Sequence, residues 1–360
     1  MTTPDVSVPL ALPRNRRTGA FERQVARAIA PHVRAEVPLV VACSGGPDSL
    51  ATLVAVARTR PAQGVTAAQF DHRLRPASEV AEERRLVQAV ARAIGAGFAG
   101  GRAGRVPVDR AESAAREARY RWLARACTTV SAAACVTGHT LDDQAETVLL
   151  RLVRGTGIGG AAGMAEVSPW PIPPRGPRAR SGPLLLRPLL GIGRAAVEDY
   201  LDALGLAAAR DPSNDTLEYA RNRVRQRVMP ELRALNPRSA EQIAGFAARA
   251  RADDAALGEW AAAAAAALAG PGERGPAGSI ALDRGALLEL PVAVAVRVVR
   301  IAAGTLGVAL ERGQAEATLH AAAARGRRAA LGGGVEAWRD GAWLRIGRAG
   351  SGGDSARSCS

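Results

Sequence analysis

Six consecutive residues near the start of this 360-residue chain combine hydroxyl, carboxylate and glycine in a pattern suited to phosphate binding. The six are Ser44, Gly45, Gly46, Pro47, Asp48 and Ser49. Glycine lets a phosphate approach the backbone N–H groups of a turn, and a carboxylate can hold Mg²⁺ against phosphate oxygens. The run matches neither GxxxxGK[ST] nor GxGxxG, and no lysine stands beside it. We therefore expect a phosphate-binding turn of another type, with a serine-capped glycine turn as the simpler alternative.

The residues on either side of this turn favour the phosphate site. The preceding run VPLVVA, at 37–42, is apolar and valine-rich, which is typical of a strand buried on both faces of a parallel sheet. The run LATLVAVA that follows has the pattern of a helix. A turn between a strand and a helix N-terminus directs unpaired N–H groups and the positive end of the helix dipole at one place.

Three acidic side chains, Asp142, Asp143 and Glu146, crowd the start of another predicted helix. If Thr140 caps this helix, Asp143 completes a capping box and Asp142 interacts favourably with the helix dipole. That arrangement accounts for one or two of the acids without any ligand. Glu146 lies on the same face, three to four residues further on, and clustered acids need a cation. The cation is either Mg²⁺ or the ammonium group of a substrate.

Other candidate residues have an ordinary structural explanation when each is taken alone. His139 by itself is more often a hydrogen-bonded structural histidine than a catalyst, and Arg119 lies on a helix where surface charge is the simplest explanation. Arg221, Asn222 and Arg225 belong to an arginine-dense predicted helix. This helix is either a solvated face or a phosphate-binding element.

The order of predicted elements indicates a doubly wound, mostly parallel α/β sheet, because strands alternate with helices. Strands are expected at 37–42, at 65–70, at 134–137, and at either 97–99 or 106–108. A charged amphipathic helix at 78–94 has the outward charges of a solvated face. Such sheets bind ligands at the carboxyl ends of their strands. The residues at 44–49, 71–75 and 138–139 each follow a strand, so we expect them to converge at one edge of the sheet.

The chain divides into four predicted parts. A flexible lead-in at 1–18 precedes an α/β catalytic domain at 19–235, a smaller helical and α+β domain at 236–346, and a disordered tail at 347–360. The smaller domain is expected to contain a long helix at 239–268, a strand at 279–282, helices near 285–304 and 311–324, and a hairpin at 335–346. The hairpin turns at Asp340-Gly341.

The composition points to a polyanionic partner, nucleic acid first. The formal net charge is +14. All 48 basic residues are arginine, which indicates compositional bias rather than selection for guanidinium chemistry, so only the sign of the charge is informative. Aromatic residues make up only 3% of the chain, so platforms for stacking bases are scarce. No apolar run is long enough to span a membrane, and four cysteines without CxxC spacing suit reduced thiols in the cytoplasm.

Longer strings carry a resemblance to known families. The string SGGPDS at 44–49 is similar to the pyrophosphatase loop of the N-type ATP pyrophosphatases, the PP-loop superfamily. Further strings resemble the tRNA(Ile)-lysidine synthetase family and occur in its order: DHRLRP at 71–76, EARYRW at 117–122, TGHTLDDQAETVLLRLVRG at 137–155, RPLL at 187–190, DPSND at 211–215 and RNRVR at 221–225. Together they cover about residues 36–235, and the string from 137 to 155 is the most specific.

This resemblance implies an ATP-dependent ligase. In the family, ATP adenylates the C2 carbonyl oxygen of the wobble cytidine, position 34, in the CAU anticodon of an isoleucine tRNA. The ε-amino group of free L-lysine then attacks C2 and expels AMP. The product, lysidine, pairs with A rather than G, which changes the codon read from AUG to AUA. The implied cofactors are ATP and Mg²⁺, the partners are tRNA(Ile) and lysine, and a homodimer is one expected assembly.

The resemblance also assigns roles to individual residues. Ser44–Ser49 would bind pyrophosphate with Asp48 on Mg²⁺, and His72 and Arg75 would line the nucleotide site. Arg119 could neutralise charge on the adenylate, with His139 beside it. The resemblance does not divide the roles within the two remaining groups. The acids would hold Mg²⁺ or the lysine ammonium, with Asp143 the second candidate metal ligand; they are Asp142, Asp143 and Glu146. The residues of the arginine-dense helix would contact tRNA or position the loop; they are Arg221, Asn222 and Arg225.

Three alternatives stay open from the residues. A tRNA thiolase of the same superfamily would use the same loop but often needs paired cysteines, and none here are suitably spaced. An amidating synthetase would need an ammonia source, and no glutaminase signature is present. A non-catalytic RNA-binding protein would explain the charge but not a phosphate turn beside an acidic helix.

Overall fold

The computed structural model describes residues 12–60, 64–104, 112–172, 182–209, 217, 219–270 and 279–348. The chain forms two units, Met1–Arg249 and Ala250–Ser360, which divide within one long helix. The predicted segments DPSND at 211–215 and 106–108 lie outside the described residues, as do most of 347–360 and 1–18. In the described residues, no helix is both long and apolar enough to cross a lipid bilayer.

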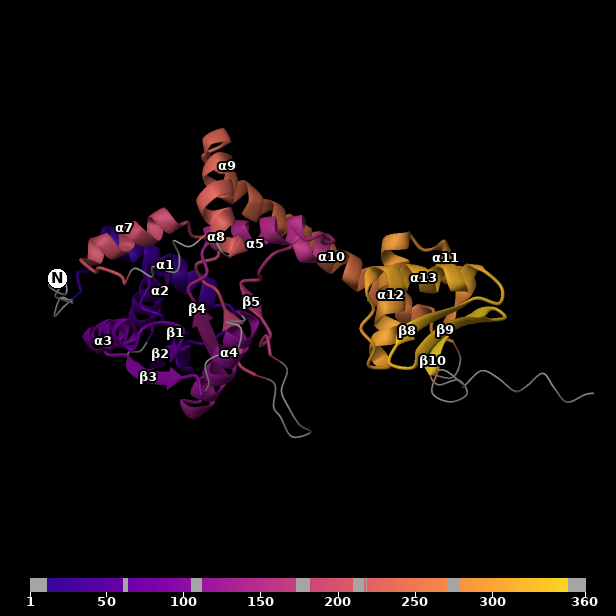
Figure 1. Cartoon of the computed structure of the whole chain (residues 1–360), viewed down its shortest axis with the longest axis horizontal. Helices are drawn as coiled ribbons and strands as arrows, with labels where there is room; N and C mark the ends of the chain where they lie inside the picture. The colour runs from indigo at the N-terminus through magenta and orange to yellow at the C-terminus, as the bar shows by residue number, and fades with distance from the viewer. Residues whose placement is uncertain are drawn as a thin grey trace, which may run out of the picture. The chain divides into compact units, whose positions relative to one another are not determined.

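The first unit holds a parallel sheet between helices (Figure 1). Its elements in chain order are α1 (Arg16–Ile29), β1 (Leu39–Ala42), α2 (Pro47–Arg58), β2 (Val65–Asp71), α3 (Ala77–Ala93), β3 (Gly97–Arg102), α4 (Glu112–Thr129), β4 (Ala134–Thr137), α5 (Leu141–Val153), α6 (Ile158–Ala161), β5 (Val167–Ser168), β6 (Leu184–Leu186), α7 (Arg194–Leu204), α8 (Ala220–Arg223), the π-helical turn η4 (Val224–Val228), α9 (Met229–Leu235) and the start of α10 (Ser239–Ala267).

The described strands pair in the order β3-β2-β1-β4-β6-β5, and only the short β5 runs antiparallel to its neighbour. The prediction of a doubly wound, mostly parallel sheet is therefore confirmed. β3, at one end of this order, occupies the first of the two positions that the sequence allowed. β1 lies between β2 and β4, so connections leave it in both directions, and the crevice at such a switch point is where these sheets bind ligands.

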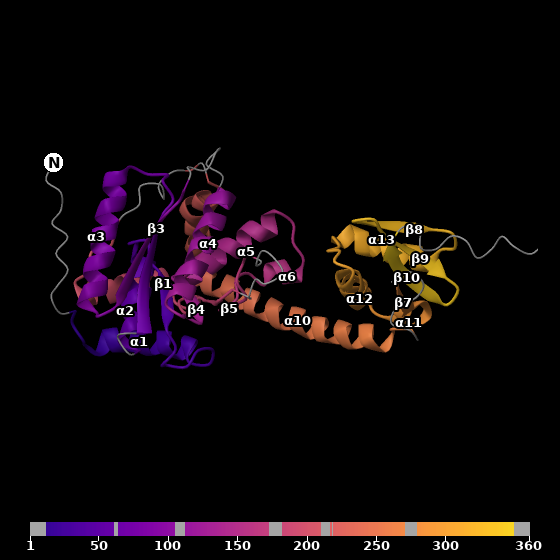
Figure 2. The same cartoon turned by 90° about the horizontal axis from the view of Figure 1, so that it is seen from below.

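Alternation along β1 explains how the sheet is covered on both faces. Leu39 and Val41 pack in the apolar core beneath α1, α2, α3 and α7, whereas Val40 packs with Tyr120 and Leu123 of α4 on the opposite face. In Figure 2 the strands lie between α3 and α4. All three β1 side chains are fully buried, which is why the strand reads as a continuous apolar run.

The arginine-dense helix predicted at 219–235 is interrupted by a wider turn. Its segments α8 and α9 are joined by η4, in which the N–H of Met229 bonds the carbonyl of Val224 five residues back. Pro230 follows directly and has no N–H for an α-helical bond, so the wider register accommodates it. The π turn carries Arg225, and α8 carries Arg221.

The second unit pairs helices with a separate antiparallel sheet. Beyond the end of α10 it contains β7 (Ile280–Asp283), α11 (Arg284–Glu289), α12 (Val292–Thr305), α13 (Arg312–Ala323), β8 (Arg328–Gly332), β9 (Val335–Asp340) and β10 (Trp343–Arg348). The predicted hairpin is confirmed, with Trp343 opposite Asp340 and Gly341 at a φ of +57° in the turn. The region 285–304 is two helices, because Pro291 ends the first and begins the second.

Candidate active site

The turn after β1 has a conformation that glycine adopts easily. Gly45 has a φ of +94°. The Ser49 hydroxyl accepts a hydrogen bond from the N–H of Ser44 at 3.2 Å and donates one to the carbonyl of Gly46 at 2.9 Å, so this side chain closes the turn. Helix α2 then begins at Pro47, and among the described residues no side chain caps its N-terminus. Its first N–H groups can therefore bind an anion.

Asp48, in the first turn of α2, has the properties of a metal ligand. Its Oδ1 atom is buried and has no hydrogen-bond partner among the described residues. Burial, together with the nearby Asp143 and Asp142, raises the pKa of Asp48 to about 6, although Arg194 and Arg225 act against this shift. A divalent cation would coordinate the unpaired oxygen and would also offset the unfavourable negative charge. Asp48 therefore fits Mg²⁺.

The described residues contain no group of three His, Cys, Asp or Glu side chains arranged to hold a metal. This is compatible with Mg²⁺, which proteins usually bind through one or two carboxylates while substrate phosphates and waters supply the other ligands. The phosphates of a bound nucleotide would therefore supply the Mg²⁺ ligands that the protein itself does not provide.

Gly138, directly after β4, brings a second segment against the turn. A Cβ atom at this position would lie 2.6 Å from the carbonyl oxygen of Asp48 and 2.8 Å from Oγ1 of Thr52. Because the neighbouring atom is backbone, no side chain fits there without a shift of α2. The segments that follow β1 and β4, far apart in the sequence, thus contact each other at the carboxyl ends of adjacent strands.

Two histidines at this edge are held neutral by their surroundings. Burial lowers the pKa of His72 to about 4, and Arg119 adds to the shift. Burial likewise lowers the pKa of His139 to about 3 despite the carboxylate of Asp143, and Arg119 again contributes. His139 Nδ1 lies 2.9 Å from the hydroxyl of Thr137. Arg119 of α4 therefore acts on residues that follow both β2 and β4.

The acidic cluster on α5 is paired with arginines of the same chain. Asp143 accepts the N–H of Thr140 at 2.9 Å, so the predicted capping box is confirmed. Its other oxygen accepts bonds from Arg221 at 2.9 Å and Arg225 at 3.0 Å. Glu146, only 1% exposed, accepts from Arg225 Nε at 2.7 Å and Arg221 Nε at 3.0 Å. The acids are thus paired with two guanidinium groups of the chain itself, whereas the sequence pointed to Mg²⁺ or a substrate ammonium group as their cation.

These pairs decide the charge state of the cluster. Burial alone would raise the pKa of Asp143, but Arg221, the N–H of Thr140, His139 and Arg225 together lower it. Burial also disfavours the charge on Arg225, yet its bonds and proximity to Glu146 raise the pKa of the guanidinium. The surroundings therefore favour the charged forms of both Asp143 and Arg225, which lie side by side.

Asp142 connects three helices. One of its oxygens accepts the backbone N–H of Arg194, the first residue of α7, at 2.7 Å. The other oxygen accepts a bond from the guanidinium of Arg233 in α9. Both carboxylate oxygens therefore have partners within the chain, and the side chain joins α5 to α7 and α9.

Arg75 is held beside the phosphate turn by an ion pair with Glu83, an acid that the sequence analysis did not single out. Its two terminal nitrogens each contact one oxygen of Glu83 at 2.6 Å. A Cβ atom on Gly45 would lie 3.4 Å from the Cβ of Glu83, which places this ion pair against the turn. Glu83 is 8% exposed, so it departs from the solvated face predicted for helix α3.

Comparison with known proteins identifies the family. Residues 18–232 match the family model described as a PP-loop domain. The chain is 43% identical over 295 residues to a tRNA(Ile)-lysidine synthase from Salinispora arenicola, covering 80% of this chain and 82% of that protein. It is 40% identical over 291 residues to a tRNA(Ile)-lysidine synthase from Methylobacterium nodulans, covering 79% of each. The chain belongs to the tRNA(Ile)-lysidine synthase family.

A solved structure agrees with the fold assignment. The U34-tRNA thiolase NcsA from Methanococcus maripaludis, with its [4Fe-4S] cluster, superposes with a TM-score of 0.53 at 15% sequence identity, covering 65% of this chain and 79% of that one. At this identity the likeness concerns the fold alone.

The structure brings the candidate residues of this lysidine synthase family member to one edge of the sheet. The turn at 44–49, the histidines and the arginine-paired acids follow β1, β2 and β4, and buried Asn222 lies on α8 between the paired arginines. Sequence reasoning missed Glu83, Arg194 and Arg233. For the two arginines no local signal exists, because Asp142 lies 52 and 91 residues away from them.

Proposed function

We propose that the chain ligates L-lysine to C2 of the wobble cytidine, position 34, of tRNA(Ile) with a CAU anticodon, and converts ATP to AMP and pyrophosphate. The observation that carries this proposal is the convergence, at one edge of a parallel sheet, of an uncapped helix N-terminus, a carboxylate with a buried unused oxygen and a cluster of mixed charge. Family membership supports the choice of substrates.

In the first half-reaction the cytidine O2 attacks the α-phosphorus of ATP, and the bond to the pyrophosphate group breaks. The N–H groups of the turn and of the α2 N-terminus bind the leaving pyrophosphate. Asp48 would hold Mg²⁺, with Asp143 as the second candidate ligand; when bound, the ion offsets negative charge on the phosphates. Arg119 of α4 contributes to the lowered pKa of both His72 and His139, so its positive charge acts near these residues and can offset charge on the adenylate.

In the second half-reaction the lysine ε-amine attacks C2, the bond from C2 to the adenylate oxygen breaks, and AMP leaves as the amine loses a proton. Free lysine carries an α-carboxylate and two ammonium groups. The cluster of Asp143 and Glu146 with Arg221 and Arg225 offers both signs of charge within hydrogen-bond reach of each other. His139 is neutral at physiological pH because its pKa is lowered to about 3, so it does not repel the ammonium.

The test is incubation of the protein with ATP, Mg²⁺, labelled lysine and a CAU-anticodon tRNA(Ile) transcript. Label in the RNA and release of AMP support the proposal. Asp48→Asn should abolish the label, whereas Asp199→Asn, a change at an exposed position on α7, should leave it intact. If wild-type protein transfers no lysine but modifies the same base in another way, the substrate assignment is wrong.

Thiolation of the tRNA is the other class of activity that the sequence left open. Cys43, Cys127 and Cys135 are each buried as free thiols, and no observation on the described residues favours this alternative. The homodimer and the cytoplasmic location stay predictions.

A further inference from the structure

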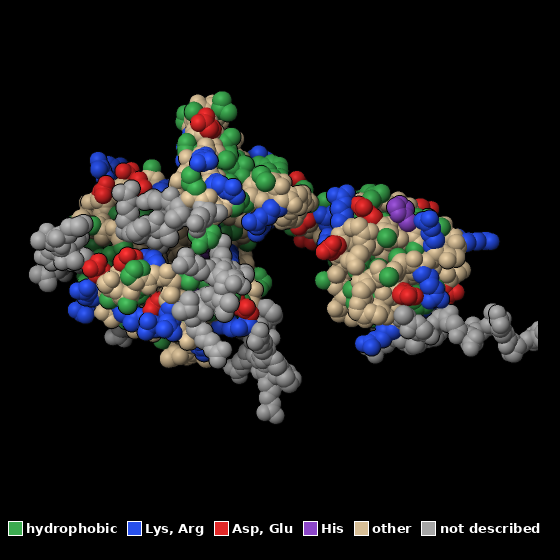
Figure 3. Space-filling model, viewed as in Figure 1, with side chains coloured by type: hydrophobic (Ala, Val, Ile, Leu, Met, Phe, Trp, Pro, Cys, Tyr) green, Lys and Arg blue, Asp and Glu red, His purple; other side chains and the backbone are tan. Residues whose placement is uncertain are grey.

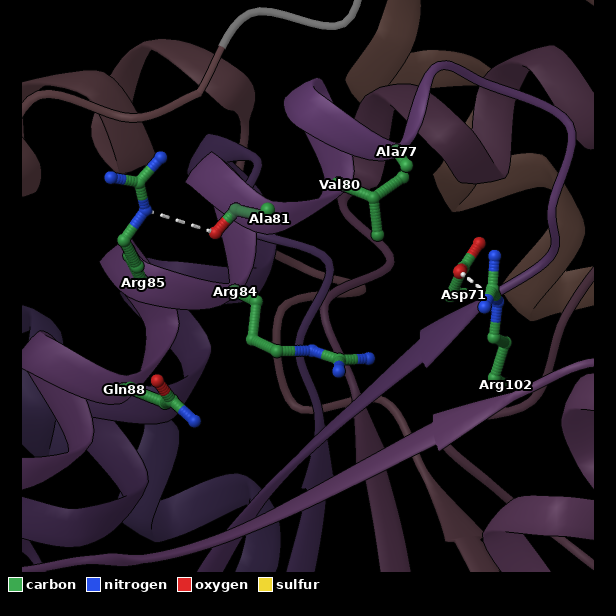
Figure 4. Close-up of a pocket in the computed structure, with 8 residues that line it drawn as sticks. All are labelled: Asp71, Ala77, Val80, Ala81, Arg84, Arg85, Gln88 and Arg102. Atoms are coloured by element: carbon green, nitrogen blue, oxygen red, sulfur yellow. Dashed lines mark hydrogen bonds and ion pairs between the residues drawn. The ribbon is translucent and has the colours of Figure 1, made fainter.

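A basic pocket lies between α3 and the edge of the sheet, apart from the residues already described. It is lined by Asp71, Ala77, Val80, Ala81, Arg84, Arg85, Gln88 and Arg102, and its volume is about 350 Å³ (Figure 4). A water molecule occupies about 30 Å³ in the liquid, so the pocket holds a phosphate group together with part of a sugar. Three arginines against one aspartate give its lining a net charge of 3 − 1 = +2.

The guanidinium groups in this pocket retain unused donors. Arg84 donates through Nε to Gln69 at 3.3 Å, Arg85 through Nε to the carbonyl of Ala81 at 3.4 Å, and Arg102 contacts Asp71 through Nε at 3.1 Å. Each guanidinium has four further N–H bonds on its terminal nitrogens, and within the described residues none of these has a partner. Paired N–H groups of this kind match the oxygens of a phosphate.

The pocket opens at the edge of the sheet where the candidate active site lies. Asp71 and Arg102 are the last residues of β2 and β3 and are paired in register. His72, a candidate nucleotide-site residue, directly follows Asp71. β3 is two strands from β1, which corresponds to roughly 10 Å at the usual strand spacing. A phosphate in the pocket would therefore be a short step along an RNA chain from the turn at 44–49.

The lining suits a nucleic-acid strand better than a small free anion. Ala77, Val80 and Ala81 form an apolar wall next to the arginines, which suits a ribose beside its phosphate. The side chain of Arg102 is 59% exposed, so an extended strand can reach it. Arginine side chains gather on the surface over α3, β2 and β3 (Figure 3).

We propose that Arg84 and Arg102, with Arg85 adding to the positive charge of the pocket, bind a backbone phosphate of the RNA substrate next to the nucleotide that enters the active site. This inference rests on the proposed function, because it takes the polyanion to be the RNA that the enzyme modifies. The contact is independent of base identity, so it positions the strand and does not read its sequence.

The test is equilibrium binding of an unmodified CAU anticodon stem-loop between 50 and 200 mM salt, without ATP or lysine. The double variant Arg84→Gln/Arg102→Gln should bind about tenfold more weakly, and its plot of log affinity against log salt should be shallower by about 0.7 to 1.4, the value for one or two lost phosphate contacts on a single strand. The single variant Arg102→Gln, at a largely exposed position, should give about half of this change without affecting folding.

Arg92→Gln is the matched control, because Arg92 is exposed in the last turn of the same helix and does not line the pocket. It should leave the affinity and the salt slope unchanged. Equal slopes for wild type and the double variant would overturn the inference, and so would a loss of MgATP binding with RNA binding intact, which would make the pocket a nucleotide site. Because RNA binding is measured without lysine transfer, failure of the proposed function would leave this result interpretable.

Discussion

We predict that Asp48→Asn makes the folded protein more stable while it abolishes ATP-dependent activity. Asp48 has a buried oxygen without a partner among the described residues, and its pKa is raised to about 6, chiefly by burial. An asparagine of the same shape removes the buried negative charge. The wild-type side chain is thus unfavourable for folding and useful for binding a cation, a trade that is common at functional sites.

The magnitude follows from the pKa. The pKa of Asp48 rises from 3.8 to about 6, and each pKa unit corresponds to about 1.4 kcal/mol. The charged side chain therefore lowers the free energy of unfolding by at most about 3 kcal/mol at neutral pH. The folded protein keeps the Asp48 proton to a higher pH than the unfolded chain does. This contribution to stability is fully present below pH 3.8, and it is lost as the pH rises through about 6. The stability difference between variant and wild type should therefore be near zero at pH 4 and reach about 1–3 kcal/mol at pH 7.

Urea unfolding followed by circular dichroism, at several pH values between 4 and 8, measures this difference. Asp199→Asn, at an exposed position, is the control and should show no pH-dependent gain. MgATP should stabilise the wild type and not Asp48→Asn, since a ligand stabilises only the state that binds it. The reasoning would be refuted if Asp48→Asn were less stable than wild type at pH 7. It would also be refuted if the difference in the free energy of unfolding between variant and wild type were the same at every pH.

Two further variants test the packing around the site. Glu146→Gln should lower the free energy of unfolding of the first unit by about 2–3 kcal/mol, because it leaves two partly buried arginines short of a partner. The control Glu316→Gln, in an exposed pair with Arg312, should not change the free energy of unfolding measurably. Equal urea midpoints for the two variants would contradict this expectation. Gly138→Ala should cost both stability and lysine transfer, since its Cβ would lie 2.6 Å from a backbone oxygen of α2, while Gly191→Ala, with no atom within 4 Å, should behave like wild type in the same thermal melts and transfer assays.

Much of the fold follows from short-range patterns in the chain. The strand, turn and helix around 37–57, the capping box of Thr140 with Asp143 and the hairpin at Asp340-Gly341 are each encoded within a few neighbouring residues, and residue type and spacing predict all three. Alternation of strands and helices is likewise enough to predict the sheet class. Local preferences of this kind need no contact between distant segments.

Tertiary structure decided which charges meet. The sequence showed three acids on α5 and an arginine-dense helix, but only folding brings Glu146 and Arg225, 79 residues apart, to within 2.7 Å. The same holds for the buried Glu83 beside Arg75, since burial depends on what packs over a helix face and not on its own pattern. The chain's sequence thus determined the elements and the edge of the sheet where the chemistry gathers. The pairing of acids with arginines, and the raised pKa of Asp48, arise only when distant segments exclude water from the same small volume.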